Sequence, residues 1–146
     1  MIIEVSKETL LDAARIHAEA WREAHMEFCS PEFVAEHTVE RQAAFLQREL
    51  SCGKKLYMLM EELPVGIVSI HGDLIENLYI LPSEQRKGYG TKLLRFAIGQ
   101  CEKSPTLWLL SNNIAAYRLY EKHGFGETGN RKQLRENLFE IEMRLQ

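Results

Sequence analysis

The chain has 146 residues, of which 45% are hydrophobic and 27% are charged, and its formal net charge is −3. This length suits a single domain over residues 1–146, and the composition excludes a disordered or fibrous protein. A pI near 6.0 leaves no basic footprint for a nucleic-acid partner. No apolar run approaches the roughly 18 residues of a membrane span. We therefore expect a cytoplasmic protein that binds neither nucleic acid nor a membrane.

The cysteines and histidines give no metal or disulfide pattern. Cys29, Cys52 and Cys101 lie far apart with no C-x-x-C spacing, so we expect reduced thiols and no zinc site. The five histidines form no His-Glu-x-x-His pattern, which argues against metal ligation. They are His17, His25, His37, His71 and His123.

The N-terminal third is predicted to be a strand followed by two helices. Residues 2–5, Ile-Ile-Glu-Val, are predicted to form a short strand, and Thr9 to Asp12 has the form of a capping box. Helical spacing of apolar residues then predicts a helix to about residue 27 and a second one over about 32–50. Cys29-Ser30-Pro31 separates the two.

The remainder alternates between strand and helix. The predicted elements are strands at 56–60, 65–70 and 74–81, a helix from the following glycine loop to Cys101, a strand at 106–110, a helix at 113–122, and a hairpin of 127–134 with 137–145. A strand, helix, strand unit crosses over right-handedly, so 74–81 and 106–110 are expected to lie side by side and parallel. Such a pair places a ligand crevice at the carboxyl ends of its strands.

The loop between these strands has the composition of a phosphate-binding loop. Gly88 and Gly90 let consecutive main-chain N–H groups converge on an anion at a helix start, and Arg86, Lys87 and Thr91 add charge and a hydroxyl. A plain strand-to-helix connection would also contain such glycines. The spacing excludes a Walker loop, because the lysine precedes the glycine, and a dinucleotide fingerprint, because the third small residue is replaced by leucine.

Two motifs in this half resemble the GNAT (Gcn5-related N-acetyltransferase) superfamily. Gln85-Arg86-Lys87-Gly88-Tyr89-Gly90 matches its Gln/Arg-x-x-Gly-x-Gly/Ala coenzyme A loop. Residues 113–125 match the pattern Asn-x-x-Ala-x-x-Leu-Tyr-x-x-x-Gly-Phe at every fixed position. The motifs occur in the family's order with strand, helix and strand between them, and the likeness extends over nearly the whole chain.

The resemblance implies an α/β fold, a mixed and mostly antiparallel seven-stranded sheet with about four helices, in which 74–81 and 106–110 splay apart. It also implies acetyl transfer from acetyl-CoA to a primary amine by direct attack in a ternary complex. The loop amides would hold the pyrophosphate, the strand before it would pair with the pantetheine, and the Leu78 N–H would face the thioester oxygen. The residues implied to bind acetyl-CoA are Leu78, Tyr79, Ile80, Gln85, Arg86, Lys87, Gly88, Tyr89, Gly90, Thr91 and Asn113.

Two residues are candidates for proton transfer. Glu76 precedes Leu78 by two positions, so strand alternation predicts that both face the same side, and we expect Glu76 to accept the amine's proton through water. Tyr120 would donate a proton to the departing thiolate, because a tyrosine stays protonated at neutral pH. The competing interpretations are an ordinary exposed carboxylate for Glu76 and a packing or cofactor-orienting role for Tyr120.

The acceptor is not identified by the sequence. Trp21, His25, Phe28 and Phe33 resemble the acceptor wall of the family, although each could belong to the core. A small-molecule amine is the first expectation and a protein N-terminus or lysine the second. The same loop would also serve a non-catalytic coenzyme A sensor or a nucleotide-binding domain. The family likeness leaves open a homodimer through the terminal strands.

Overall fold

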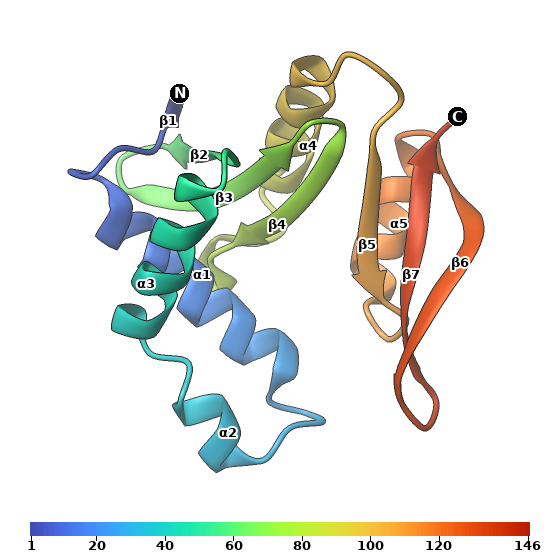
Figure 1. Cartoon of the computed structure of the whole chain (residues 1–146), viewed down its shortest axis with the longest axis horizontal. Helices are drawn as coiled ribbons and strands as arrows, with labels where there is room; N and C mark the ends of the chain where they lie inside the picture. The colour runs from blue at the N-terminus through green and yellow to red at the C-terminus, as the bar shows by residue number, and fades with distance from the viewer.

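A seven-stranded sheet forms the centre of the computed structural model, which describes residues 1–146. The strand order is β1-β2-β3-β4-β5-β7-β6, and β4 with β5 is the only parallel pair (Figure 1). The strands are β1 (Ile2–Glu4), β2 (Lys55–Met60), β3 (Pro64–His71), β4 (Leu74–Ile80), β5 (Thr106–Leu110), β6 (Phe125–Arg135) and β7 (Leu138–Leu145). The expected mixed, mostly antiparallel sheet of seven strands is confirmed.

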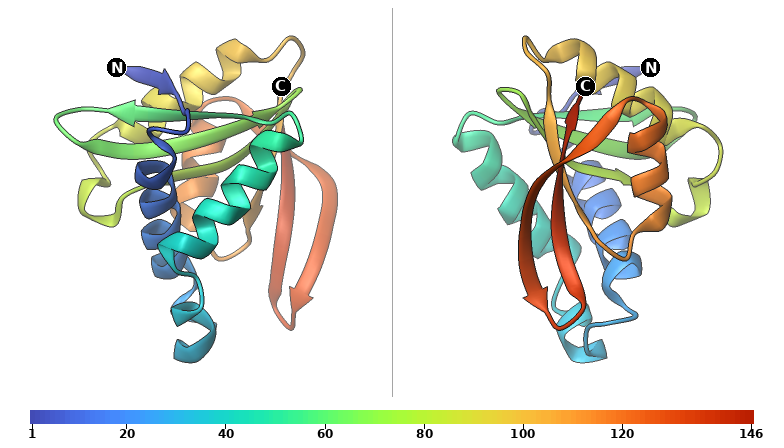
Figure 2. Two further views of the ribbon diagram at one scale, coloured as in Figure 1. Left: turned by 60° about the vertical axis from the view of Figure 1, so that its left-hand side comes forward. Right: turned by 90° about the vertical axis from the view of Figure 1, so that its right-hand side faces the viewer.

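Helices cover both faces of the sheet. The α-helices are α1 (Leu10–His25), α2 (Pro31–Ala35), α3 (Val39–Ser51), α4 (Tyr89–Gln100) and α5 (Ile114–Lys122), and a 3-10 turn, η1, spans Pro82–Glu84. Figure 2 shows α1 and α3 on one side of β2, β3 and β4, with α4 on the other. The helix α5 lies with α4 on that second side, beside β5 and β7.

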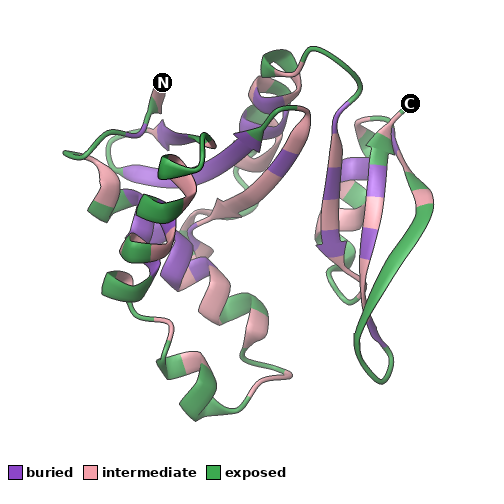
Figure 3. Ribbon diagram, in the orientation of Figure 1, coloured by how far each residue is buried: buried purple, intermediate pink, exposed green.

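Alternation along the central strands divides the core into two clusters. In β2, Met58 packs with Ile67 and α1, whereas Tyr57 and Leu59 pack with α4 and the β5–β7 half. Leu93 and Leu94, near the start of α4, are fully buried in that second cluster. Buried residues therefore concentrate along β2, β3 and the facing sides of the helices (Figure 3). The helical and strand periodicities seen in the sequence produce these clusters.

The helical region before β2 differs from its prediction in two respects. The helix expected over about 32–50 is split into α2 and α3, because the Thr38 hydroxyl caps a new helix by accepting from the Arg41 N–H at 3.2 Å. Ser30 caps α2 in the same way. The capping box expected at Thr9 is wrong, since its hydroxyl instead accepts from the Ser6 N–H at 2.9 Å. The chain therefore has five α-helices rather than about four.

Candidate active site

The parallel strands β4 and β5 pair only at their beginnings. Leu74 lies opposite Thr106 and Ile75 opposite Leu107, and no later residue of β4 has a partner on β5. Beyond these pairs β5 is hydrogen-bonded only to β7, along its whole length. The two strands diverge visibly toward their carboxyl ends (Figure 1). The splayed pair expected from the sequence is therefore present, and it leaves residues 76–80 without a neighbouring strand on one side.

The glycine loop at the end of β4 presents a run of unbonded main-chain amides. The N–H groups of residues 85–91 donate no hydrogen bond, and the first amide of α4 with an acceptor is that of Lys92, which donates to the Gly88 carbonyl at 3.2 Å. Gly88 has φ +85, a conformation that glycine adopts without a steric penalty. These amides form the positive end of α4, so the loop offers an anion site made of backbone.

Arg86 is the free cation of this loop. Its backbone has φ +65, in the left-handed region, where a residue with a Cβ is strained. The Arg86 residue lines the cleft between this loop and α5. Lys87 is held instead by Glu84, with the ammonium 2.7 Å from the carboxylate, and this hydrogen bond raises the pKa of the exposed Lys87. The Gln85 side chain donates to the Ile80 carbonyl at 3.3 Å. The loop's charge is thus smaller than the sequence suggests.

A cleft of about 580 Å³ runs from this loop into the gap between β4 and β5. Leu78, Tyr79 and Ile80 form one wall, and the start of α5 forms the other. Of the remaining residues predicted to bind acetyl-CoA, Gln85, Arg86, Tyr89, Gly90 and Asn113 also line the cleft. Lys87, Gly88 and Thr91 do not line it.

Tyr120 lies deep in the same cleft. Its side chain is 7% exposed and makes no hydrogen bond, and burial raises its pKa, with a smaller contribution from Tyr79. The phenol therefore stays protonated well above neutral pH. Asn113 caps α5, its carboxamide oxygen accepting from the Ala116 N–H at 3.1 Å, as the sequence predicts. Asn113 also lines the cleft, and its amide NH₂ donates no hydrogen bond within the protein.

A β-bulge in β4 corrects the expected position of Glu76. Ile67 pairs with Tyr79 but Ser69 pairs with Glu76, so β4 contains one residue more than β3 in this stretch. Asn77 takes up the extra residue with φ +51, and its side chain donates to the Ser69 hydroxyl at 3.2 Å. Glu76 therefore shares a face with Tyr79, and the prediction that it shares one with Leu78 is wrong.

On its own face, Glu76 lines a second cavity of about 440 Å³. This cavity shares Leu78, Tyr79, Asn113 and Tyr120 with the cleft, so the two meet at the gap between the strands. Of the four residues predicted for the acceptor wall, Trp21 and His25 line it, with their rings stacked at 3.9 Å. Phe28 and Phe33 line neither the cleft nor this cavity.

The far wall of the second cavity comes from residues that the sequence did not single out. Trp108 of β5, Lys132 of β6 and Glu140 of β7 all contribute to it. Because Glu140 pairs with both Leu110 and Lys132 across the strands, these side chains share a face. The alternation of charged residues along β7 was a usable signal, but strand pairing was needed to bring Glu140 beside Glu76.

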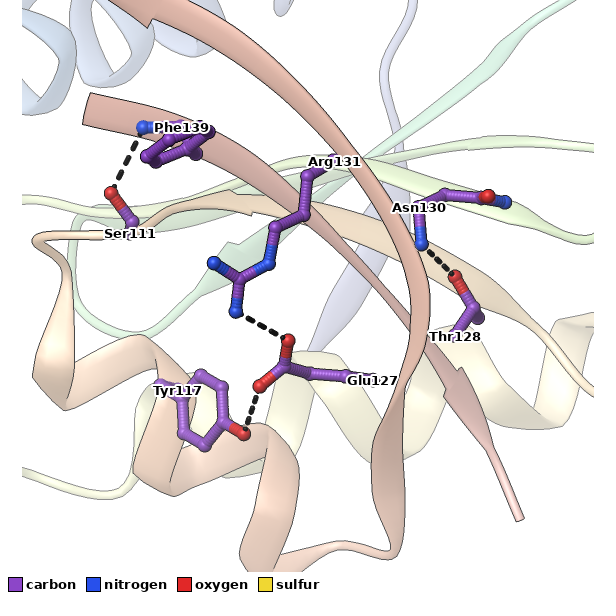
Figure 4. A network of polar contacts seen from close by, with 7 residues as sticks. All are labelled: Ser111, Tyr117, Glu127, Thr128, Asn130, Arg131 and Phe139. Atoms are coloured by element: carbon purple, nitrogen blue, oxygen red, sulfur yellow. Dashed lines mark hydrogen bonds and ion pairs between the residues drawn. The ribbon is translucent and has the colours of Figure 1, made fainter. Parts of the chain in front are cut away.

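The hairpin that carries this wall is fastened to the helix that carries Tyr120. The hydroxyl of Tyr117 in α5 donates to Glu127 of β6 at 2.8 Å, and Arg131 donates to the same carboxylate at 2.9 Å (Figure 4). Ser111, just after β5, accepts from the Phe139 N–H at 3.0 Å. The hairpin and α5 are therefore held in one arrangement around the site.

The structure contains neither a cluster of metal-ligating side chains nor a membrane-spanning helix. No three His, Cys, Asp or Glu side chains gather closely enough to hold a metal ion. None of the helices combines the length and apolar character needed to span a bilayer.

Comparison with known proteins agrees with this architecture. A family model described as an acetyltransferase (GNAT) domain matches residues 53–127. A comparison with curated proteins finds no match. The structure is similar to apo YjaB from Escherichia coli, with a TM-score of 0.77 and 22% identity over 99% of this chain and 95% of that one.

Two other similar structures were determined with a cofactor. PaiA N-acetyltransferase from Thermoplasma acidophilum, in complex with coenzyme A, has a TM-score of 0.71 and 18% identity over 97% of this chain and 96% of that one. YncA from Salmonella typhimurium, with acetyl-CoA, has a TM-score of 0.73 and 21% identity over 100% of this chain and 92% of that one. At this level of identity the likeness defines the fold.

The seven-stranded sheet with its splayed β4–β5 pair has the fold of an acetyltransferase domain. The family model covers more than half of the chain, including the glycine loop and α5. The chain belongs to the GNAT family of acetyltransferases. The family resemblance inferred from the two motifs is thereby confirmed.

Proposed function

We propose that this protein transfers an acetyl group from acetyl-CoA to the primary amine of a small-molecule acceptor by direct attack in a ternary complex. One observation carries the proposal: seven consecutive amides, residues 85–91, donate no hydrogen bond beside a gap that opens between β4 and β5. Amides at a helix start bind a pyrophosphate, and an unpaired strand edge binds an extended amide-containing chain such as pantetheine. Coenzyme A has both parts.

The β4 edge would bind and polarise the donor. Residues Leu78 to Ile80 would pair with the pantetheine as an added strand, which lays the thioester across the gap. The Leu78 N–H would then donate to the thioester oxygen and stabilise the negative charge that develops there. The amide NH₂ of Asn113, on the opposite wall, would bind the same arm.

Tyr120 would supply the proton for the leaving group. It lines both the cleft and the second cavity, so it lies where donor and acceptor meet. Its hydroxyl has no partner within the protein and is kept protonated by burial. A protonated phenol at this point donates to the thiolate sulfur as the carbon–sulfur bond breaks.

Glu76 would accept the proton that the amine must lose. An alkylammonium has a pKa of about 10.4, so it needs a base before it can attack at neutral pH. Glu76 lines the acceptor cavity and is ion-paired with Lys54 at 2.9 Å, an arrangement that fixes the position of the carboxylate. A water between Glu76 and the amine would relay the proton.

The acceptor cavity favours a small amine over a protein side chain. Its volume of about 440 Å³ is in the range of ligand pockets for small molecules. Glu76 and Glu140 line it and provide negative charge for an ammonium. We therefore place a small cationic amine before a protein N-terminus or lysine as acceptor.

Thiol release from acetyl-CoA in the presence of a panel of amines tests this function. The panel contains alkylamines, diamines, amino acids and a lysine-containing peptide. Turnover with at least one small amine, and N-acetyl product by mass spectrometry, is the expected result. Saturable binding of coenzyme A with no turnover on any member would instead identify a coenzyme A sensor, and turnover on the peptide alone would reassign the acceptor.

A further inference from the structure

The acceptor cavity contains an amine that belongs to the protein. The Nζ atom of Lys132 lies 4.7 Å from the centre of the Trp108 ring, and both residues line the cavity that also holds Glu76 and Tyr120. A lysine ammonium over a tryptophan face is a favourable cation–π contact. Lys132 thus presents a primary amine on the acceptor side of the gap.

The neighbour of Lys132 in β6 shows on which face of the sheet Lys132 lies. Arg131 points to the opposite face, where it binds Glu127 beneath α5 (Figure 4). Because side chains alternate along a strand, this contact turns Lys132 toward Trp108 and the cavity. The Tyr117–Glu127 hydrogen bond joins the same stretch of β6 to the helix that carries Tyr120.

The carboxylates near Lys132 differ in how far they are already engaged. Glu142 accepts from Thr128 at 2.7 Å and from Asn130 at 2.9 Å, and these hydrogen bonds lower its pKa. Glu76 is held by Lys54. Glu140 lies directly opposite Lys132 in the β6–β7 register, and its carboxylate makes no hydrogen bond or ion pair. It is therefore the carboxylate free to take a proton from Lys132.

We propose that Lys132 is an acetylation site of this protein, modified by its own active site in cis. The proposal rests on the proposed acetyltransferase function and adds a specific acceptor atom to it. Lys132 is exposed enough to move, and its flexible stem lets the amine leave the Trp108 ring for the gap at Leu78.

The step balances without any further reactant. The Lys132 ammonium gives one proton to Glu140, and the free Nζ pair attacks the acetyl carbonyl of acetyl-CoA. A carbon–nitrogen bond forms, the carbon–sulfur bond breaks, and the sulfur leaves with the electron pair. Tyr120 protonates that thiolate, and the nitrogen of the new amide loses its second proton to water. Glu140 and Tyr120 then return to their starting states by proton exchange with water. The products are acetylated Lys132, coenzyme A and one proton.

The experiment incubates the purified full chain with isotopically labelled acetyl-CoA and no added amine, and follows each lysine by peptide mass spectrometry. We expect Lys132 to be labelled at least about ten-fold faster than the exposed Lys7, because a tethered amine has a high effective concentration. Its first-order rate should not depend on protein concentration. The Tyr120→Phe variant should lose this advantage and keep only the slow chemical labelling seen at Lys7.

Three outcomes overturn the proposal: labelling of Lys132 no faster than of Lys7, labelling undiminished in Tyr120→Phe, or a rate proportional to protein concentration. The thiol-release assay on the same preparation separates this failure from that of the proposed function. Turnover of free amines with an unlabelled Lys132 rejects self-acetylation alone. Absence of both reactions rejects both. In the Lys132→Arg variant, which keeps the charge over Trp108, the fast labelling must disappear. Fast labelling of another lysine in this variant would contradict the assignment of Lys132 as the acceptor.

Discussion

The Glu76 carboxylate lies 2.9 Å from the Lys54 ammonium, whose second partner is Glu49 at 2.8 Å. Burial opposes the charge of Lys54, but the hydrogen bond that Lys54 donates to Glu49 and the ion pair with Glu76 outweigh burial and raise the pKa of Lys54. The Glu76 oxygen in this pair is itself buried and has no hydrogen bond of good geometry. The ion pair with Lys54 thus holds the Glu76 carboxylate in place through one oxygen. The second oxygen makes no contact of this kind and is available to the acceptor cavity.

Replacing Glu76 by Gln should lower kcat/KM by about 10²-fold at neutral pH, because the amine loses its proton acceptor. The loss should shrink toward alkaline pH, where more of the amine is already deprotonated. Glu49→Gln is the matched control, because it removes the other partner of Lys54 outside the cavity. A loss of the same size at every pH, or an equal loss in Glu49→Gln, would assign Glu76 a structural role. A pH–rate profile of the three proteins decides between these.

Tyr120→Phe should reduce kcat by about 10²-fold and leave the affinity for acetyl-CoA nearly unchanged. The phenol acts on the leaving group, and its hydroxyl makes no hydrogen bond whose loss would disturb the fold. Since burial raises the Tyr120 pKa, the wild-type rate should also hold steady up to about pH 10, the ordinary pKa of tyrosine. Tyr57→Phe is the control, because Tyr57 is nearly as buried as Tyr120 but lines neither the cleft nor the second cavity. Parallel losses of kcat and of acetyl-CoA affinity would mean that Tyr120 only positions the donor.

Gly88→Ala should weaken coenzyme A binding by distorting the amide loop. Gly88 has φ +85, and forcing a Cβ into this region costs about 1 kcal/mol, although no atom lies within 4 Å of that position. Gly53→Ala is a close match, with φ +89 and equally open surroundings, but it lies in the turn between α3 and β2, outside the amide loop. Urea unfolding should show similar destabilisation of both variants, whereas titration calorimetry should show weakened binding only for Gly88→Ala. Equal coenzyme A affinities in the two would remove the loop from the binding site.

His17 should make the fold sensitive to mild acid. Burial lowers its pKa to about 4, and its Nδ1 has no hydrogen-bond partner. The unfolded chain binds the proton with a pKa of about 6.5, so the native state is favoured above that pH and loses up to about 3 kcal/mol as the pH falls from 6.5 to 4. Unfolding by denaturant between pH 7 and 5 should show about 2 kcal/mol of this loss in the wild type and in the exposed control His71→Gln. The loss should be smaller in His17→Gln, in which His25 still has a pKa lowered by burial. Parallel curves for all three would contradict it.

The sequence alone predicted the features that depend on residues close together in the chain. The glycine loop, the Asn113 cap and the two core faces follow from spacing within single elements, and all of them are present. The prediction that side chains alternate strictly along β4 was wrong, because β4 contains a bulge. A bulge depends on how β3 and β4 pair, and the residues around Asn77 gave no sequence signal for it. Thr38 is a residue type that caps helices, but the apolar residues on both sides of it keep helical spacing, so one continuous helix was predicted.

The acceptor side was harder to foresee for a related reason. Trp108, Lys132 and Glu140 belong to three strands, and only the β5-β7-β6 order brings them opposite Trp21 of α1. In the sequence, Trp108 is one apolar residue of a buried strand, and Lys132 is one of several hairpin charges. Phe28 and Phe33, which are near Trp21 in sequence, lie outside both cavities. Proximity along the chain was therefore a poor guide to this wall.

A crystal structure of the protein with coenzyme A is the decisive test of donor binding, on which the proposed chemistry depends. We predict the pyrophosphate within hydrogen-bond distance of the amides of residues 85–91 and the pantetheine in the gap between β4 and β5, with its sulfur near Leu78 and Tyr120. Coenzyme A bound elsewhere, or a pyrophosphate held only by side chains with those amides still unbonded, would contradict this mode of binding.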